Sequence, residues 1–563
     1  MLKHLLLPLT LTLASCTATL PQPAPPARGM VSAADPRAAE AGREILNAGG
    51  SAADAAIATA IALTVVEPQS SGLGGGGFIV HHDERRDRVT SFDGREEAPS
   101  AAGPDWFLGP DGKPMSIGEA IPGGKSVGVP GNIRMMALAH SRHGKLSWAR
   151  LFDPAIRLAR DGFAITPRFR RALESSERTA GLTAWGRATF YDASGAPKAV
   201  GTVVRNPDLA AFLEQLAARG PDWFYTGANA EALVRTVNQA PRNPSRMAAG
   251  DLAAYDAKQR EPLCGTYRVY RICGMGPPSS GGTTVFAILK QLERFDMSAF
   301  RPDDPRAWHL IGDSMRLAYA DREAYLGDPD HVSVPVAGLM DAAYLKSRGQ
   351  LIDPQRALAS VSAGTPPGAK RAAAGVDSEV AGTSHLVAVD GVGNVASFTS
   401  TIESVFGSGL TFHGLYLNNE LTDFSMVPVR DGMPVANRVE GGKRPRSSMS
   451  PTIVYGPDGE VRIAIGAAGG TTIIAQVAKA LIGVLDWNLT AQEAIALPTM
   501  IGIGDQLRVE RGTSLEAMAP ALTGMGHRVV PVDPGFKANA VERVAGRWRG
   551  AADPRSEGVA LAQ

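Results

Sequence analysis

The sequence predicts a layered α+β fold that is built from both sides of a change in pattern near residue 383. Helical spacing prevails over residues 130–217 and again over residues 305–326. After residue 383 the texture changes to alternating strands. A segment rich in Pro, Gly and Ala, residues 365–382, separates the two textures. Strands and helices in separate runs indicate a layered α+β domain.

Two helices open the predicted globular part. Residues 35–47 have helical spacing that stops at Gly49 and Gly50, and Ser51 is a suitable N-cap for a second helix through Val66. Because this second helix is apolar on nearly all faces, we expect it to be buried. The loop of residues 70–77, rich in glycine, then leads into a short strand at residues 78–80.

A predicted hairpin carries two cysteines, Cys264 and Cys273. If residues 267–270 form a tight reversal, the two cysteines lie opposite each other, and an oxidising compartment would permit a disulfide. Two unpaired buried thiols fit the sequence equally well. Cys16 is the only other cysteine, so the spacing fits neither a metal cage nor a zinc ribbon. We predict no metal and no organic cofactor.

The clearest elements after residue 383 form a hairpin. The sequence predicts strands at residues 385–389, 395–401, 453–455 and 461–465, and a helix at about residues 472–485. If Val389 pairs with Val395 across the turn, the same register puts Thr401 opposite Thr383. A hydroxyl there can hydrogen-bond the Thr383 hydroxyl and fix its rotamer, although an ordinary cross-strand threonine pair fits as well.

Composition limits the class of protein. The 563 residues allow several domains or one large continuous core, and 44% apolar with 20% charged residues is typical of a globular protein. The formal net charge is +1 and no block of like charges occurs, so nucleic acid is not an expected partner.

The N-terminus predicts export. Residues 1–15 combine a short basic start with an apolar run that is too short to span a bilayer, as in a signal peptide. Leu13-Ala14-Ser15-Cys16 resembles a bacterial lipoprotein box, in which Cys16 would be the lipidated first residue; a coincidental cysteine is the alternative. The Pro-rich residues 16–29 read as an extended spacer. We expect a periplasmic protein or an outer-membrane lipoprotein, with membrane contact only through a lipid anchor.

Two apparent motifs do not fit their contexts. Residues 72–77 contain G-x-G-x-x-G, but they follow a helix and precede a strand, the reverse of the order that dinucleotide binding needs. Residues 124–128 match G-x-S-x-G, but no apolar strand precedes them and Pro130 prevents a helix from starting directly after them. We interpret both as loops without these functions.

The Gly382-Thr383 step has the features of a backbone cleavage site, because a flexible segment runs directly into a strand there. If the bond is cut, Thr383 becomes a new N-terminus. Its free amine can take the proton from its own hydroxyl, so one residue supplies both nucleophile and base.

Several further motifs occur in one order along nearly the whole chain from Gly29. They are Val66-Glu67-Pro68 with residues 70–78, residues 276–282, Gly382-Thr383-Ser384-His385, residues 417–420 with Asp423-Phe424, residues 444–452, Gly469-Gly470 and residues 553–556. In this combination the chain resembles the γ-glutamyltranspeptidases. The resemblance implies an N-terminal nucleophile hydrolase with a four-layer αββα sandwich. A large subunit, residues 30–382, and a small catalytic subunit, residues 383–563, would form it jointly as a heterodimer cut from one precursor.

The resemblance also implies catalytic roles. Thr383 would attack the Gly382 carbonyl in the precursor and the γ-amide of the donor in the mature enzyme, with Thr401 beside it. A glycine at position 382 would let the backbone adopt the conformation needed for that approach. The N–H groups of Gly469 and Gly470 would form the oxyanion hole.

Substrate recognition is expected to divide by charge. The α-carboxylate of the donor requires hydrogen-bond donors, and its α-ammonium requires acceptors. By resemblance, the carboxylate falls to Arg95, Ser447 and Ser448, and the ammonium to Glu420 and Asp423.

This chain departs from the family pattern at three places. Glu403 stands where many members have Asn, and we expect it to contact the ammonium while altering the pH dependence. Thr422 replaces the first acid of the usual Asp-Asp-Phe. Residues 426–443 form a short lid without an aromatic residue, which favours access by water and bulky donors.

The predicted function is therefore hydrolysis of glutathione and related γ-glutamyl amides, with transfer to amino acids or short peptides. A cephalosporin or glutaryl acylase of the same fold is one alternative. A non-catalytic protein that binds γ-glutamyl compounds is another.

Overall fold

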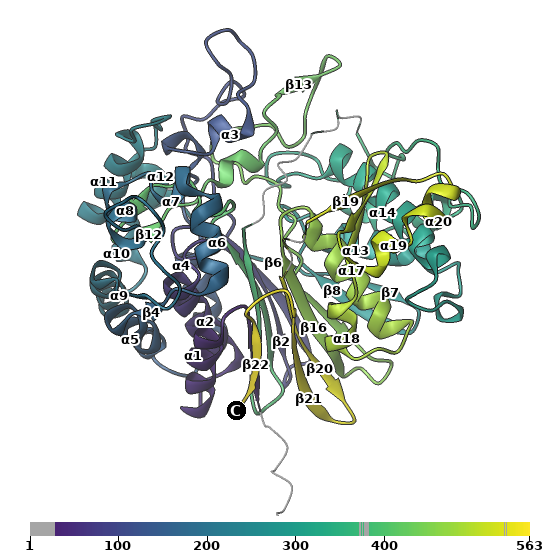
Figure 1. The fold of residues 1–563 in the computed structure, drawn as a ribbon, viewed down its shortest axis with the longest axis horizontal. Coiled ribbons are helices and arrows are strands. Elements are labelled where there is room, and N and C mark those ends of the chain that lie inside the picture. The colour runs from purple at the N-terminus through teal and green to yellow at the C-terminus, as the bar shows by residue number, and fades with distance from the viewer. Residues whose placement is uncertain (1–28, 371–372, 374, 376–381, 534, 536) are drawn as a thin grey trace, which may run out of the picture.

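The computed structural model describes residues 29–370, 373, 375, 382–533, 535 and 537–563. Cys16, the predicted signal peptide and most of the spacer lie outside these residues. Two β-sheets lie face to face at the centre, and helices cover the outer face of each (Figure 1). None of the helices within the described ranges is long and apolar enough to cross a membrane. The predicted αββα sandwich is confirmed.

The first sheet mixes strands from before and after residue 383. Its order is β22 (Val559–Ala562), β1 (Met30–Ala33), β9 (Ser384–Val389), β10 (Val395–Thr401), β2 (Gly76–Asp83), β3 (Arg88–Asp93) and β6 (Lys258–Arg260). Strand β1 pairs with β22 on one side and β9 on the other, and both partners come from the C-terminal part. Strand β2 is longer than predicted because it pairs with β10 and β3 along its whole length.

The second sheet is also shared between the two parts of the chain. Its order is β21 (Arg547–Ala552), β20 (Lys537–Val544), β16 (Val461–Ala468), β15 (Thr452–Tyr455), β8 (Tyr270–Gly274) and β7 (Leu263–Tyr267). Strands β7 and β8 form the predicted cysteine hairpin, in which a disulfide joins Cys264 and Cys273. The alternative of two free thiols is therefore not adopted.

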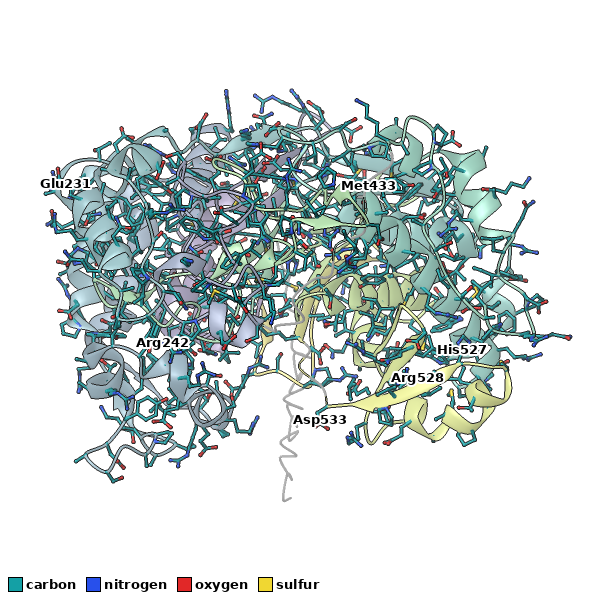
Figure 2. All side chains as sticks on the ribbon, turned by 90° about the horizontal axis from the view of Figure 1, so that it is seen from above. Glu231, Arg242, Met433, His527, Arg528 and Asp533 are labelled. Atoms are coloured by element: carbon teal, nitrogen blue, oxygen red, sulfur yellow. A yellow bond between two sulfur atoms is a disulfide. The ribbon has the colours of Figure 1, made fainter. Side chains whose placement is uncertain are left out.

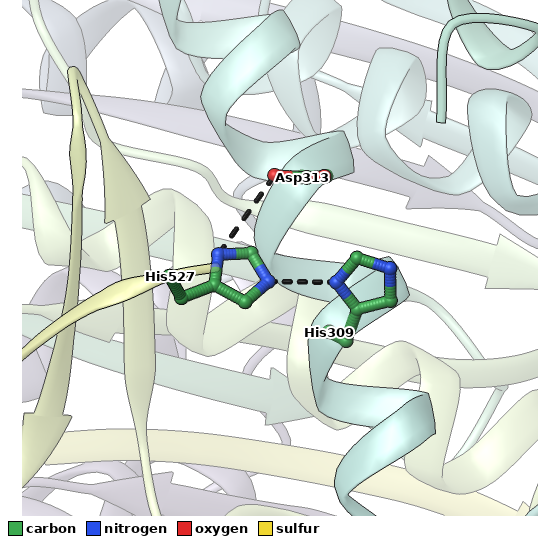
Figure 3. A group of neighbouring side chains, drawn as sticks. All are labelled: His309, Asp313 and His527. Carbon is green, nitrogen blue, oxygen red and sulfur yellow. Dashed lines mark hydrogen bonds and ion pairs between the residues drawn. The ribbon is translucent and has the colours of Figure 1, made fainter. Parts of the chain in front are cut away.

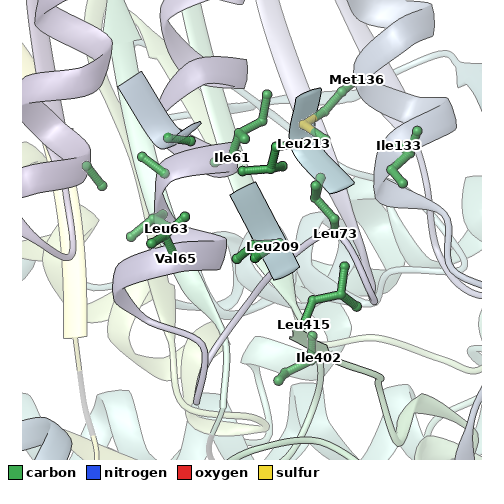
Figure 4. Close-up of a cluster of buried hydrophobic side chains, with 14 of the residues drawn as sticks. Ile61, Leu63, Val65, Leu73, Ile133, Met136, Leu209, Leu213, Ile402 and Leu415 are labelled. Atoms are coloured by element: carbon green, nitrogen blue, oxygen red, sulfur yellow. The ribbon is translucent and has the colours of Figure 1, made fainter. Parts of the chain in front are cut away.

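Helices of the N-terminal part cover the first sheet. The main ones are α1 (Pro36–Asn47), α2 (Ala52–Val66), α4 (Asn132–His143), α5 (Asp153–Asp161) and α9 (Pro207–Arg219). The predicted cap is present, since Ser51 accepts a hydrogen bond from Asp54 N, and every residue of α2 is buried. Leu63 of α2 and Leu209 of α9 belong to one apolar cluster with Ile402, which directly follows β10 (Figure 4). This core therefore holds the end of β10 in place.

A second helical layer covers the other sheet. It contains α13 (Gly281–Leu292), α14 (Pro305–Tyr325), α17 (Thr472–Leu485) and α18 (Ala491–Ala496). Beside it lies a small sheet of β17 (Met500–Ile503), β18 (Gln506–Glu510) and β19 (Arg528–Val532). Seen from above, Glu231 of the first helical layer and Arg528 of β19 lie on opposite sides of the sheets (Figure 2).

Candidate active site

Thr383 directly precedes β9 in the middle of the first sheet, and Thr401 ends the neighbouring strand β10. Ser400 pairs with Ser384, so the predicted register is confirmed, and the Thr383 and Thr401 hydroxyl oxygens lie 3.0 Å apart. Thr401 Oγ1 also accepts the Glu403 N–H at 2.8 Å. With that amide bond made, the Thr401 hydroxyl can still donate its proton to Thr383.

The backbone at the predicted cut is held in an unusual conformation. Thr383 has φ of +85°, which is strained for a β-branched residue, and its N–H donates to Ser70 O at 2.8 Å. Gly382 is required for a different reason from the predicted one. A Cβ there would lie 1.7 Å from Glu403 O, so the need for glycine is steric.

Gly469 and Gly470 lie between β16 and the N-terminus of α17. Both have positive φ, +132° and +58°, which glycine adopts without strain. Among the described residues, neither of their N–H groups donates to a protein acceptor. Two such groups ahead of a helix with its positive dipole end are suited to stabilise a negatively charged oxygen.

A buried ion pair beside Thr383 escaped the sequence analysis. Lys537 Nζ donates to Glu67 Oε2 at 2.7 Å, and to the hydroxyls of Ser70 and Ser384 at 3.1 Å each. Burial lowers the pKa of the Lys537 ammonium to about 8, an effect that Glu67 opposes. The pair anchors Ser70, whose carbonyl accepts the Thr383 N–H, and Ser384, the next residue along the chain.

All predicted site residues except Gly469 line one cavity next to Thr383. They are Thr383, Thr401, Gly470, Arg95, Glu403, Glu420, Asp423, Ser447 and Ser448. The cavity has a volume of only about 20 Å³ in the uncut chain, close to what one water molecule needs. A donor substrate therefore requires more room than the uncut chain offers.

The two predicted recognition groups are paired with each other in this cavity. The Arg95 guanidinium forms ion pairs with Glu420 and Asp423, and it donates to Pro445 O at 3.0 Å and to Arg446 O at 2.9 Å. Sequence reasoning assigned Arg95 and the acids to opposite ends of a ligand. The structure shows that they neutralise each other in the uncut chain.

Three acids converge at this point. Oxygens of Glu403, Glu420 and Asp423 all lie within 4.8 Å of one another. Glu420 is fully buried, and its Oε2 has no hydrogen-bond partner among the described residues. Burial and the nearby Asp423 carboxylate raise the pKa of Glu403 well above its usual range. A cationic group that entered here would find acceptors already assembled.

A fourth acid, Glu96, lies beside Arg95. It is fully buried, and neither of its carboxylate oxygens has a hydrogen-bond partner within the part of the chain that the structure describes. Burial raises the pKa of Glu96 to about 8, against the opposing effect of Arg95. Sequence reasoning missed this residue, although it directly follows Arg95.

Two serines complete the opposite wall with an arginine that was also missed. Arg322 of α14 donates to Ser448 Oγ at 2.8 Å and to Ser280 Oγ at 2.7 Å. Ser447 O accepts the Ser280 N–H at 2.8 Å, so the motif at residues 276–282 supports this wall. Thr422 has a structural role instead, since its hydroxyl donates to Asn419 O at 2.8 Å.

Other candidate groups do not act at this site. His385 is buried, and burial lowers the pKa of its imidazole to about 3, so it is a poor proton acceptor. Ser126 of the G-x-S-x-G stretch donates its hydroxyl to Ile121 O at 2.6 Å within a short turn, as predicted for a loop without a nucleophile. Residues 426–443 contain a short hairpin of β13 (Val429–Arg430) and β14 (Met433–Pro434) above the site (Figure 1).

Two described groups have the ligand atoms for a metal ion. One is the acid cluster of Glu403, Glu420 and Asp423, and the other is His309, Asp313 and His527. In the acid cluster, the Arg95 guanidinium would compete with a metal ion for two of the three carboxylates.

Comparisons with known proteins agree with this geometry. The sequence profile of the family described as Gamma-glutamyltranspeptidase matches residues 38–563. The "Glutathione hydrolase proenzyme" of Bacillus subtilis (strain 168) is 36% identical over 549 residues, covering 95% of this chain and 91% of that protein. The protein of the same description from Escherichia coli (strain K12) is 36% identical over 547 residues, covering 94% and 90%. The crystal structure of cephalosporin acylase from Bacillus halodurans superposes with a TM-score of 0.83 at 26% identity, covering 98% of this chain and 99% of that one.

Proposed function

Because this chain belongs to the γ-glutamyltranspeptidase family, we propose that it cuts itself before Thr383 and then acts on γ-glutamyl amides such as glutathione. It hydrolyses them or transfers the γ-glutamyl group to amino acids and short peptides. One observation carries the proposal. The Thr383 hydroxyl, paired with Thr401 at 3.0 Å, faces a cavity that holds one guanidinium and three converging carboxylates.

Maturation begins in the uncut chain. Thr383 Oγ attacks the carbonyl carbon of Gly382, the peptide bond breaks to give an ester, and water then releases the Gly382 carboxylate. The strained Thr383 backbone favours this step, because scission removes the constraint that the peptide bond imposes. The new Thr383 amine stays near Ser70 O and becomes the base for its own hydroxyl.

Turnover uses the same oxygen. Thr383 Oγ attacks the γ-carbonyl of the donor, and the N–H groups of Gly469 and Gly470 stabilise the oxyanion that develops. The leaving amine takes a proton from the Thr383 ammonium. Water or an acceptor amine then cleaves the γ-glutamyl ester and regenerates the hydroxyl.

Donor recognition follows from the ion pairs around Arg95. The α-ammonium of the donor pairs with Glu420 and Asp423, joined by Glu403, while its α-carboxylate takes over Arg95 and the hydroxyls of Ser447 and Ser448. Both partners of the internal ion pair thus receive a substitute charge from one ligand. A ligand that carried only the carboxylate would leave buried acids without a cation, which is costly.

The cleavage proposal is tested on purified protein. Mass spectrometry should find two fragments, one ending at Gly382 and one beginning at Thr383. Thr383→Ala should remain uncut and inactive, and Thr383→Ser, which keeps a hydroxyl, should still be cut. An unbroken wild-type chain would support the alternative of a non-catalytic binding protein.

An acylase activity is the second candidate, because the cephalosporin acylase superposes over nearly the whole chain. The two candidates differ in the α-amine of the substrate. We expect γ-glutamyl-p-nitroanilide to be hydrolysed much faster than glutaryl-p-nitroanilide, since only the former supplies an ammonium to Glu420 and Asp423. A preference for the glutaryl compound would favour the acylase.

We also propose export of the protein through residues 1–15, with Cys16 as the lipid attachment site. Labelling with radioactive palmitate, compared with Cys16→Ser, tests the anchor. Label in the wild type alone would support it, and equal label in both would contradict it.

A further inference from the structure

A second, larger cavity adjoins the one at Thr383. It has a volume of about 520 Å³ and is formed by α14, the β17–β18 hairpin and residues 361–363. Thr471 lines both cavities, and its carbonyl accepts a hydrogen bond from Tyr319 OH of α14. Thr471 directly follows the proposed oxyanion glycines, so the second cavity begins where the acyl carbon would lie.

The walls of this cavity are largely apolar. Tyr319 and Ala320 come from α14, Val361 and Ala363 from a loop after α16 (Ala342–Gly349), and Ile503 from the end of β17. In the uncut chain Gly375 also borders the cavity, and its N–H donates to Glu323 O at 3.1 Å. A small molecule with an apolar side chain matches these walls and this volume.

One of the two arginines that come from α14 and β18 has a structural role. The Arg316 side chain is buried, and it donates to Gly504 O at 2.9 Å and to both Asp313 Oδ1 and Leu358 O at 2.8 Å. Asp313 lies beside His527, which hydrogen-bonds His309 at 2.7 Å (Figure 3). Burial lowers the pKa of His527 to about 4, so this imidazole adds no positive charge near neutral pH. Arg316 thereby ties the β17–β18 turn to α14.

The second arginine, Arg508 of β18, is half-buried at the cavity. Its Nε lies 3.4 Å from Gln506 Oε1. A guanidinium in such a position can hold a carboxylate through two parallel N–H bonds. The only carboxylates that also line the cavity are those of Glu323 and Asp505, within the described residues, and each pairs with an arginine outside it: Glu323 with Arg446 and Asp505 with Arg528.

We propose that this cavity binds the acyl acceptor, an amino acid or dipeptide with a free carboxylate and an apolar side chain, and that Arg508 binds that carboxylate. This inference rests on the proposed transferase function. The acceptor amine, in its neutral form, attacks the carbonyl carbon of the γ-glutamyl ester. A C–N bond forms, the bond from that carbon to Thr383 Oγ breaks, and the proton of the amine passes through the Thr383 amino group to Oγ.

The test compares methionine with methionine amide as acceptors, with γ-glutamyl-p-nitroanilide as donor. The measured quantity is the ratio of γ-glutamyl-methionine, or its amide, to free glutamate. The wild type should transfer to methionine more readily than to the amide. In Arg508→Gln, the transfer ratio for methionine below saturation should fall at least about tenfold, as expected for the loss of a charge-assisted hydrogen bond, while the ratio for the amide stays the same. Arg508→Lys should recover part of the loss.

Arg528→Gln is the matched control, because Arg528 lies on the neighbouring strand with an exposed side chain and does not line the cavity. It should leave both ratios unchanged. A wild type that uses methionine and its amide equally, or an Arg508→Gln variant that loses both to the same extent or neither, overturns the acceptor site. A fully cut wild type that releases no nitroaniline refutes the proposed function itself.

Discussion

Adding one methyl group at the scissile junction should stop maturation. In Gly382→Ala the new Cβ would lie 1.7 Å from Glu403 O, whereas real Cβ contacts almost never fall below 3.0 Å. Because the colliding atom belongs to the backbone, the junction must move by more than about 1 Å. A displacement of that size at reacting atoms typically costs about 100-fold in rate, or about 2.7 kcal/mol of barrier. We therefore expect cleavage at least about 100-fold slower than in the wild type.

The assay follows the appearance of the two fragments on a denaturing gel after purification at low temperature. Gly250→Ala is the matched control, since a Cβ there meets nothing within 4 Å. Melting temperature and near-UV circular dichroism establish that the uncut variant is folded. If folded Gly382→Ala matured at the wild-type rate, the steric account of this glycine would be refuted.

Three further changes test other contacts. Thr401→Val removes the hydroxyl 3.0 Å from Thr383 while keeping its shape, so kcat/KM for γ-glutamyl-p-nitroanilide should fall about tenfold, and Thr401→Ser should retain most of it; equal rates in all three proteins would contradict the contact. Lys537→Met leaves the buried Glu67 carboxylate without its cation, which should cost about 3–5 kcal/mol of unfolding free energy in denaturant titrations, and adding Glu67→Gln should restore part; no recovery would count against the ion pair. Glu96→Gln tests pH dependence. Burial raises the pKa of Glu96 from 4.5 to about 8, so the folded chain holds a proton that the unfolded chain has released, and stability present below pH 4.5 declines as the pH rises toward 8. The variant should melt progressively higher than the wild type between pH 5 and 8, and parallel melting curves would exclude this assignment.

The hairpin after residue 383 could be predicted from the sequence because strand pairing is a local rule. Once the turn at residues 390–394 sets Val389 against Val395, every later pair follows, including Thr383 with Thr401. The same local logic predicted α2, whose cap and continuous apolar face leave no other interpretation. The disulfide needed one additional fact, the compartment, which register alone does not supply.

The ionic organisation of the site could not be predicted in this way. Glu67 and Lys537 belong to different parts of the chain, and only the packing of the two sheets brings them together. Each charge considered alone fits a solvated surface. Likewise, resemblance identified Arg95 and Glu420 as contacts for a ligand, but not that they would pair with each other before any ligand binds.

Both central sheets alternate strands from the two sides of the Gly382–Thr383 bond. Strand β1 is clasped between β9 and the C-terminal β22, and β8 is joined to β15. Scission would thus sever one covalent link while leaving the ladders on either side of it intact. The products should stay welded through any dilution, and separately synthesised halves would each present bare strand edges prone to aggregate. Folding of the whole chain must come first, and the break can follow only afterwards.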